Sequence, residues 1–217
     1  MTNTLLFTES SDLTDLKSFL LRAKKLDEAG FVRLKTFDQI LTVTVSPIYD
    51  PGILGTGPKV LGMRVVRMAN SESVDGVFEI SAILERLAAL DGTARLDLLL
   101  PAVTHKVAWG GISAPQAGWE EVGELNSFGL QIIAQEGIAE VAQALGTSIG
   151  ASISNKVRFE IWGREIAGGE GAPTAAAFAL FGLGFLDTKN PVKIYRSGGW
   201  LRLTTAFGHV LVRSNRS

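Results

Sequence analysis

The feature that most constrains the fold is an internal repeat between the beginning and the end of the chain. When the sequence is shifted by 160 residues, residues 19–45 align without a gap to residues 179–205, and 6 of the 27 positions are identical. Both segments hold the end of an apolar helical stretch and then two runs in which apolar and polar residues alternate. The repeat predicts two helix–strand–strand units, which either are related by a pseudo-twofold axis or use one common supersecondary motif twice.

The remaining periodicity predicts an α+β fold of antiparallel hairpins with about five or six helices. Apolar residues recur at helical spacing in five stretches, at residues 12–26, 79–90, 126–145, 149–162 and 174–186. Short alternating runs predict strands at residues 4–8, 31–37, 40–45, 61–69 and 94–100, and a meander of three strands within 192–213. Because the helix at 174–186 is apolar on nearly all sides, we expect it to be buried.

Composition places the chain among ordinary globular proteins. It has 217 residues, of which 46% are hydrophobic and 20% are charged, and its net charge is -1. A disordered chain would have fewer apolar residues and a larger net charge. We expect a single globular domain over residues 1–217, with the alternative of two merged halves at about 1–101 and 120–217.

Several classes of chemistry are excluded by residue types that are rare or absent. There is no cysteine, which excludes disulfide scaffolds, thiolate metal sites and cysteine nucleophiles. The two histidines, His105 and His209, are not in a metal-ligand spacing, so we expect no metal and no cofactor. The amino-terminal residues lack a basic start, and the apolar tract at 175–186 is shorter than the ~20 residues that a membrane span needs. These features predict a cytoplasmic protein without a membrane segment.

One motif suggests catalysis. Residues 146–150 match the G-x-S-x-G pattern that surrounds the nucleophile of serine hydrolases, with Ser148 at its centre. Asp187 and His209 follow in the chain order that such a triad requires. However, a helix rather than a strand is expected before Ser148, which favours a helix cap at this position. A serine-dependent hydrolase that uses Ser148, Asp187 and His209 is therefore an alternative to a non-catalytic role.

A second constellation suggests binding. If the apolar residues of the alternating runs face the core, six basic and aromatic side chains face outward, namely Arg33, Lys35, Lys193, Tyr195, Trp200 and Arg202. Rings that stack on bases and cations that bind phosphates form the usual surface for single-stranded nucleic acid. The same residue types also occur on solvated strand faces and in dimer contacts. Single-stranded nucleic-acid binding through this face is thus a second alternative.

The centre of the chain carries two tryptophans at the ends of a segment rich in glycine and proline. Because a tryptophan side chain can bury roughly 150–250 Å², we expect at least one of Trp109 and Trp119 to be packed. Packing against a second copy of the chain would make this segment a self-association site. The acidic residues that follow, Glu120, Glu121 and Glu124, are expected to form a solvated turn before the next helix.

Three stretches carry a resemblance to a known set of proteins. They are DLTDLKSFLLRAKKLDEAGFVRL near the beginning, SAPQAGWEEVGEL in the centre and FGLGFLDTKNPVKIYRSGGWLRLTTAFGHVLVR near the end. They resemble a set of actinobacterial conserved hypothetical proteins, and the resemblance runs over most of the chain. It implies a cytoplasmic bacterial protein and no particular activity.

The poor inventory of catalytic groups favours a non-catalytic protein that binds or assembles with a partner. The sequence does not identify this partner, and self-association is one option. Charge is segregated, since residues 70–145 hold 11 acidic and 3 basic residues, whereas residues 187–217 hold 6 basic and 1 acidic. Such asymmetry either marks a binding face or is neutralised within the fold.

Overall fold

The computed structural model describes residues 4–48, 59–146 and 151–213, and these residues form an α+β fold with five helices and ten strands. The predicted fold class is therefore confirmed. The chain divides into two compact units, the first made of Met1–Pro47 and Met63–Ile112, the second of Ile48–Gly62 and Ser113–Ser217. No helix in the described parts of the chain is both long and apolar enough to span a bilayer. The single domain expected over residues 1–217 stays a prediction.

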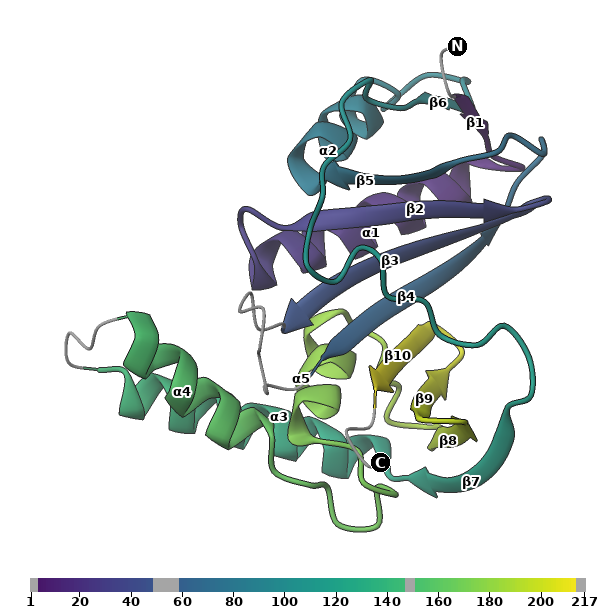
Figure 1. Ribbon diagram of the computed structural model, residues 1–217. Helices are drawn as coiled ribbons and strands as arrows, with labels where there is room; N and C mark the ends of the chain where they lie inside the picture. The colour runs from purple at the N-terminus through teal and green to yellow at the C-terminus, as the bar shows by residue number, and fades with distance from the viewer. Residues whose placement is uncertain (1–3, 49–58, 147–150, 214–217) are drawn as a thin grey trace. The chain divides into compact units, whose positions relative to one another are not determined.

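The first unit is a sheet with two helices (Figure 1). Its strands are β2 (Phe31–Phe37), β3 (Ile40–Ile48), β4 (Val60–Arg67) and β5 (Asp75–Glu79), which lie side by side in the order β5-β2-β3-β4. Helices α1 (Ser10–Leu26) and α2 (Ile80–Ala88) pack against each other, and the short strands β1 (Thr4–Leu6) and β6 (Asp97–Leu99) form a separate antiparallel pair. The apolar stripe predicted for α1 is its buried face, made of Leu13, Leu16, Phe19, Leu20 and Ala23.

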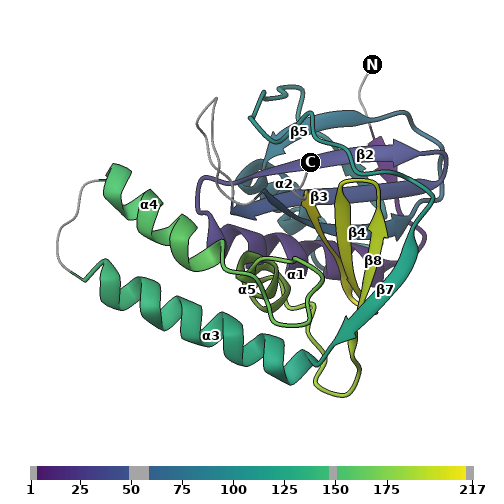
Figure 2. The ribbon, with the colours of Figure 1, turned by 60° about the horizontal axis from the view of Figure 1, so that its bottom comes forward.

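The second unit has the same kind of architecture. Its sheet has the order β7-β8-β9-β10, with β7 (Glu120–Leu125), β8 (Val192–Ser197), β9 (Trp200–Thr205) and β10 (Gly208–Arg213). Its helices are α3 (Ser127–Ala144), α4 (Ala151–Trp162) and α5 (Thr174–Gly182), and α3 packs along both α4 and α5 (Figure 2). Helix α5 is buried as predicted, because its alanines and Leu180 are fully covered.

The repeat found in the sequence is present in the strand register. In the first hairpin Leu34 lies opposite Val43, and in the second hairpin Ile194 lies opposite Leu203. A shift of 160 residues converts the first pair into the second, and the same holds for every residue pair between β8 and β9. Since a slip of one residue would turn each side chain to the opposite face, the two units bury equivalent positions.

The turns of the two hairpins also correspond. The first turn residue is Asp38 in one hairpin and Gly198 in the other, and their φ angles are 53° and 54°. Glycine adopts this left-handed region without steric cost, whereas aspartate is one of the few other residues that tolerate it. The shared backbone conformation is independent support for the repeat.

The equivalence extends to an edge strand in each unit that the sequence analysis did not predict. Phe78 of β5 lies opposite Val32, and Leu125 of β7 lies opposite Val192, the equivalent residue of β8. In both units the edge strand leads directly into a helix, α2 after β5 and α3 after β7. Phe78 and Leu125 are 47 residues apart, so this strand–helix module, β5–α2 in the first unit and β7–α3 in the second, repeats at a different offset from the helix–hairpin module. The helix–hairpin module consists of α1, β2 and β3 in the first unit and of α5, β8 and β9 in the second. The strand–helix module follows it in the first unit and precedes it in the second.

The position of β7 corrects the expectation for the acidic cluster. Glu120, Glu121 and Glu124 lie in a strand that pairs with β8, and not in a solvated turn. The strand has an irregularity between Glu121 and Gly123, as expected for a bulge. Charged side chains and a bulge are common on edge strands, because they discourage pairing with other chains.

A glycine inside α3 has a packing role. A methyl group at Gly137 would lie 2.4 Å from a ring carbon of Trp162, so the glycine leaves room for this indole. Trp162 is 4% exposed, and its ring lies 4.7 Å from that of Phe178 in α5. Gly129 in the same helix has no such neighbour. Trp162 therefore joins α3, α4 and α5.

Candidate functional site

The six predicted face residues are divided between the two units. Arg33 and Lys35 lie on β2, and the other four lie on β8 and β9. Tyr195 is directly opposite Arg202 in the second sheet. The residues that alternate with these four are buried, so Lys193, Tyr195, Trp200 and Arg202 share the other face of the sheet.

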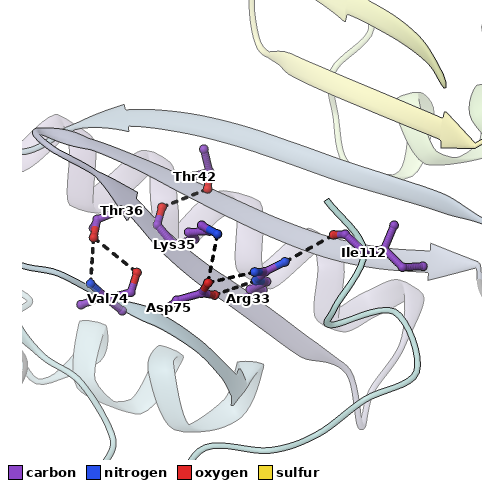
Figure 3. A network of polar contacts seen from close by, with 7 residues as sticks. All are labelled: Arg33, Lys35, Thr36, Thr42, Val74, Asp75 and Ile112. Atoms are coloured by element: carbon purple, nitrogen blue, oxygen red, sulfur yellow. Dashed lines mark hydrogen bonds and ion pairs between the residues drawn. The ribbon is translucent and has the colours of Figure 1, made fainter. Parts of the chain in front are cut away.

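In the first unit both basic residues bind one carboxylate (Figure 3). Arg33 donates two hydrogen bonds to the carboxylate of Asp75, at 2.8 and 3.0 Å, and the ammonium group of Lys35 lies 3.1 Å from the same group. A further guanidinium N–H donates to the carbonyl of Ile112 at 3.3 Å. The hydrogen bond from Arg33 is the main reason why the pKa of Asp75 is lowered. These two cations are thus already engaged within the chain.

The Asp75 carboxylate gives a testable pH dependence. Because its pKa is lower in the folded than in the unfolded chain, its stabilising contribution is present above the unfolded pKa of about 3.9 and is lost as the pH falls through the folded pKa. We expect Asp75→Asn to lower the free energy of unfolding by about 1 kcal/mol at pH 7, since the group is partly exposed. Urea unfolding at pH 7 and pH 3 should show the difference shrinking at the lower pH. If the difference in unfolding free energy between wild type and Asp75→Asn is the same at both pH values, this account is wrong. Glu85→Gln on α2, which also removes one carboxylate, serves as the control.

The second unit contains an equivalent ion pair. The ammonium group of Lys193, which corresponds to Arg33 in the repeat, contacts both carboxylate oxygens of Glu121 at 3.1 and 3.0 Å. Glu121 lies opposite Tyr195, just as Asp75 lies opposite the residue equivalent to Tyr195. The pKa of Glu121 is lowered, mainly by Lys193 and also by a hydrogen bond with Tyr195. This ion pair therefore neutralises Lys193.

Arg202 is in a different situation. Its guanidinium carbon lies 4.5 Å from the ring centre of Trp119 and 4.7 Å from that of Tyr195. Its Nε is buried without a hydrogen-bond partner, and among the described residues no carboxylate forms an ion pair with it. Burial lowers its pKa. The two ring contacts contribute roughly 0.5–2 kcal/mol each, whereas a buried N–H without an acceptor costs about 1–3 kcal/mol.

The aromatic ring over Arg202 is itself fixed. The indole N–H of Trp119 donates to the carbonyl of Pro115 at 3.0 Å, and the hydroxyl of Ser197 donates to the carbonyl of Ala117 at 3.3 Å. The segment before β7 is therefore attached to the turn between β8 and β9. We call the surface that results the Arg202 face, and it consists of Trp119, Glu121, Lys193, Tyr195, Trp200 and Arg202.

The two tryptophans of the central segment have different environments. Trp109 belongs to the first unit, is 3% exposed and lines a small pocket together with Gly30 and Ile80. Trp119 belongs to the second unit and is partly exposed. The expectation that at least one ring is packed is confirmed by Trp109. Self-association through this segment stays a prediction.

The proposed triad residues have other partners. His209 shares a hydrogen bond of 3.1 Å between its Nδ1 and the hydroxyl of Thr204, and burial together with the charge of Arg202 lowers its pKa to about 4. The Asp187 carboxylate accepts hydrogen bonds from the backbone N–H of Lys189 and the side chain of Asn190. Within the described parts of the chain, no hydrogen bond joins Asp187 to His209. Ser148 lies outside the described residues, so the hydrolase alternative stays untested.

Metal-ligating side chains do not form a cluster in the part of the chain that the structure describes. Residues 4–48, 59–146 and 151–213 contain no group of three or more histidine, aspartate or glutamate side chains placed to hold an ion. The membership of Trp119 and Glu121 in the Arg202 face was not predicted. The local pattern gives no clear signal for it, because Trp119 precedes β7 and β7 shows no regular alternation.

Comparisons with known proteins give two family matches and a fold. The family model described as Domain of unknown function (DUF8010) matches residues 1–111, and that described as Domain of unknown function (DUF8185) matches residues 114–217. A search of the curated proteins gives no match.

Among solved structures, the chain is similar to a DNA polymerase sliding clamp from Pseudomonas aeruginosa with ligand, with a TM-score of 0.51 and 13% identity over 100% of this chain. It is also similar to a putative DNA polymerase III beta subunit from Eubacterium rectale, with a TM-score of 0.54 and 10% identity over 99% of this chain. The chain spans 65% of the length of each of these proteins. At such identities the likeness is one of fold.

Proposed function

This chain belongs to the family described as Domain of unknown function (DUF8010), and we propose that it is a non-catalytic protein that binds a partner through the Arg202 face. The fold is that of proteins described as a sliding clamp and a polymerase beta subunit, which favours a role in binding or assembly. Among the described residues, His209 and Asp187 are engaged in contacts that do not form a triad.

The observation that carries the proposal is the difference between the two repeats at one position. Arg202 corresponds to Thr42, whose hydroxyl donates to the carbonyl of Lys35 at 2.9 Å. The first unit thus forms the same hairpin without a cation there. Since a partly buried guanidinium without a carboxylate is unfavourable, its presence in the second unit supports a role in binding.

Nucleic acid is the weaker alternative for this face. Three of the four basic residues predicted to bind phosphates already contact a carboxylate of the chain, because Arg33 and Lys35 share Asp75 and Lys193 pairs with Glu121. The exposed carboxylates of β7 lie beside the face and would repel a chain of phosphates. We also propose a cytoplasmic location, which cell fractionation with a tagged chain tests.

Peptide selection tests the proposal with the complete chain. We expect peptides from a random phage library, selected on the immobilised protein, to slow amide hydrogen exchange in residues 115–119 and in strands β8 and β9. Selected peptides that protect only other elements would contradict the proposed face.

Two further measurements test the alternatives. A single-stranded oligothymidine should show no saturable binding by fluorescence anisotropy at 150 mM salt. A fluorophosphonate probe, which labels serine nucleophiles, should leave the chain unlabelled. Labelling that Ser148→Ala abolishes would overturn the non-catalytic assignment.

A further inference from the structure

We infer that the Arg202 face recognises an acidic peptide segment, whose Asp or Glu carboxylate binds the guanidinium of Arg202. This inference rests on the proposed function, because it names the chemistry of the partner at the same face. Four features of the face support it, namely the fixed guanidinium, its lack of an acceptor, the local charge balance and the aromatic surface around it.

The first feature is the orientation of the guanidinium. The guanidinium carbon lies close to the ring centres of both Trp119 and Tyr195, at 4.5 and 4.7 Å, so these two rings limit the orientation of the group. The ring of Trp119 is itself held by the hydrogen bond that its N–H donates to the carbonyl of Pro115. A guanidinium held in this way matches the two oxygens of a carboxylate and loses little conformational freedom on binding.

The second feature is the missing acceptor. Arg202 forms no hydrogen bond with another described residue, although its Nε is buried. The other basic residues of the two equivalent faces each contact a carboxylate of the chain. A group from outside cannot reach the buried Nε, whereas the two Nη groups of Arg202 are not among the buried atoms. A carboxylate from outside would therefore bind the two Nη groups.

The third feature is the amount of unbalanced charge. Lys193 is paired with Glu121, and His209 on the neighbouring strand is neutral at pH 7. The face thus has one uncompensated positive charge, and Glu124, which lies opposite Lys193 on the edge strand, is exposed beside it. One carboxylate matches this balance, whereas the several phosphates of a nucleic acid would extend to this glutamate.

The fourth feature is the partly exposed aromatic surface. Three aromatic side chains of the face are incompletely covered, namely Trp119, Tyr195 and Trp200. Trp119 lies just before β7, Tyr195 lies on β8, and Trp200 lies on β9 together with Arg202. Aromatic rings favour contact with apolar side chains of a partner. The preferred segment therefore places apolar residues next to its single acid.

Two matched peptide libraries test the inference. Each is an acetylated and amidated undecapeptide mixture of uncharged residues, with Glu at the central position in one and Gln in the other. We expect the complete chain to retain Glu peptides roughly tenfold better in gel filtration followed by mass spectrometry, with enrichment of apolar residues beside the Glu. Arg202→Gln should abolish this preference, and Arg202→Lys should reduce it because the two-pronged donor is lost. Arg158→Gln, which removes an exposed arginine on α4, should leave the preference unchanged.

The outcomes separate this inference from the proposed function. If Glu and Gln peptides bind equally and slow amide exchange in β8 and β9, the face binds a partner but the carboxylate assignment is wrong. If neither library binds the chain, or both protect only other elements, both proposals fail. A preference for Glu that persists in both Arg202 variants, with intact circular dichroism spectra, would also overturn the inference. Competition by oligothymidine at 150 mM salt would favour nucleic acid instead.

Discussion

Trp162→Ala is expected to lower the free energy of unfolding by about 3–5 kcal/mol, which is a large share of the stability of a domain. The indole is buried where three helices meet, against Gly137 of α3 and Phe178 of α5. Its removal leaves a cavity. The surrounding helices fill this cavity only in part, because their own hydrogen bonds keep them rigid. Urea unfolding followed by circular dichroism measures the change, and a loss below about 1 kcal/mol would show that the three helices do not depend on this ring.

Three substitutions in α3 test this contact further, one at the contact and two as controls away from it. A methyl group at Gly137 would overlap the indole, so Gly137→Ala should destabilise the protein by roughly 1–3 kcal/mol. The same change at Gly129, where the nearest atom is 3.8 Å away, should have the opposite sign, because alanine favours helix by up to about 1 kcal/mol. Phe128→Ala, at an exposed position, should change the stability by less than about 0.5 kcal/mol.

Equivalent positions of the repeat should respond alike to truncation. Leu34 and Ile194 are both fully buried in the centre of their hairpins, opposite Val43 and Leu203. We expect Leu34→Ala and Ile194→Ala each to cost about 2–5 kcal/mol, and each to accelerate amide hydrogen exchange first in its own hairpin. Residues 38 and 198 are at the turns and are not part of either core. If one of the two substitutions is tolerated at a cost below about 1 kcal/mol, the two hairpins are not equivalent in energy despite their shared register.

The parts of the fold that the sequence predicted are those with a periodic signal of their own. The helix at Ser10–Leu26 and the hairpins beginning at Phe31 and Val192 each bury alternate or helically spaced apolar residues. The two strands that were missed, β5 and β7, occupy the same edge position in the two units. They are short, begin with acidic residues and pair on one side only. Three successive residues of β5 are buried and no residue of β7 is, so neither strand shows the alternation that would reveal it.

The same omission explains how far the site could be predicted. Alternation within β8 and β9 was sufficient to place Tyr195 and Arg202 on one face. It could not show that Lys193 and Arg33 are neutralised, because their partners Glu121 and Asp75 lie on the two missed strands. Pairing between strands that are distant in sequence decides which basic side chain is left without a carboxylate partner. The local sequence pattern does not contain this information.

The order of the two modules also bears on how such a chain could arise. Tandem duplication copies modules in the same order, yet here the helix–hairpin module comes first in one unit and last in the other. In the placement of these two modules the units are related as circular permutants are, and their strand–helix modules are adjacent in sequence. For the same reason, an alignment with one fixed offset detects the hairpins and passes over the edge strands, and only a comparison that allows permutation recovers the complete repeat.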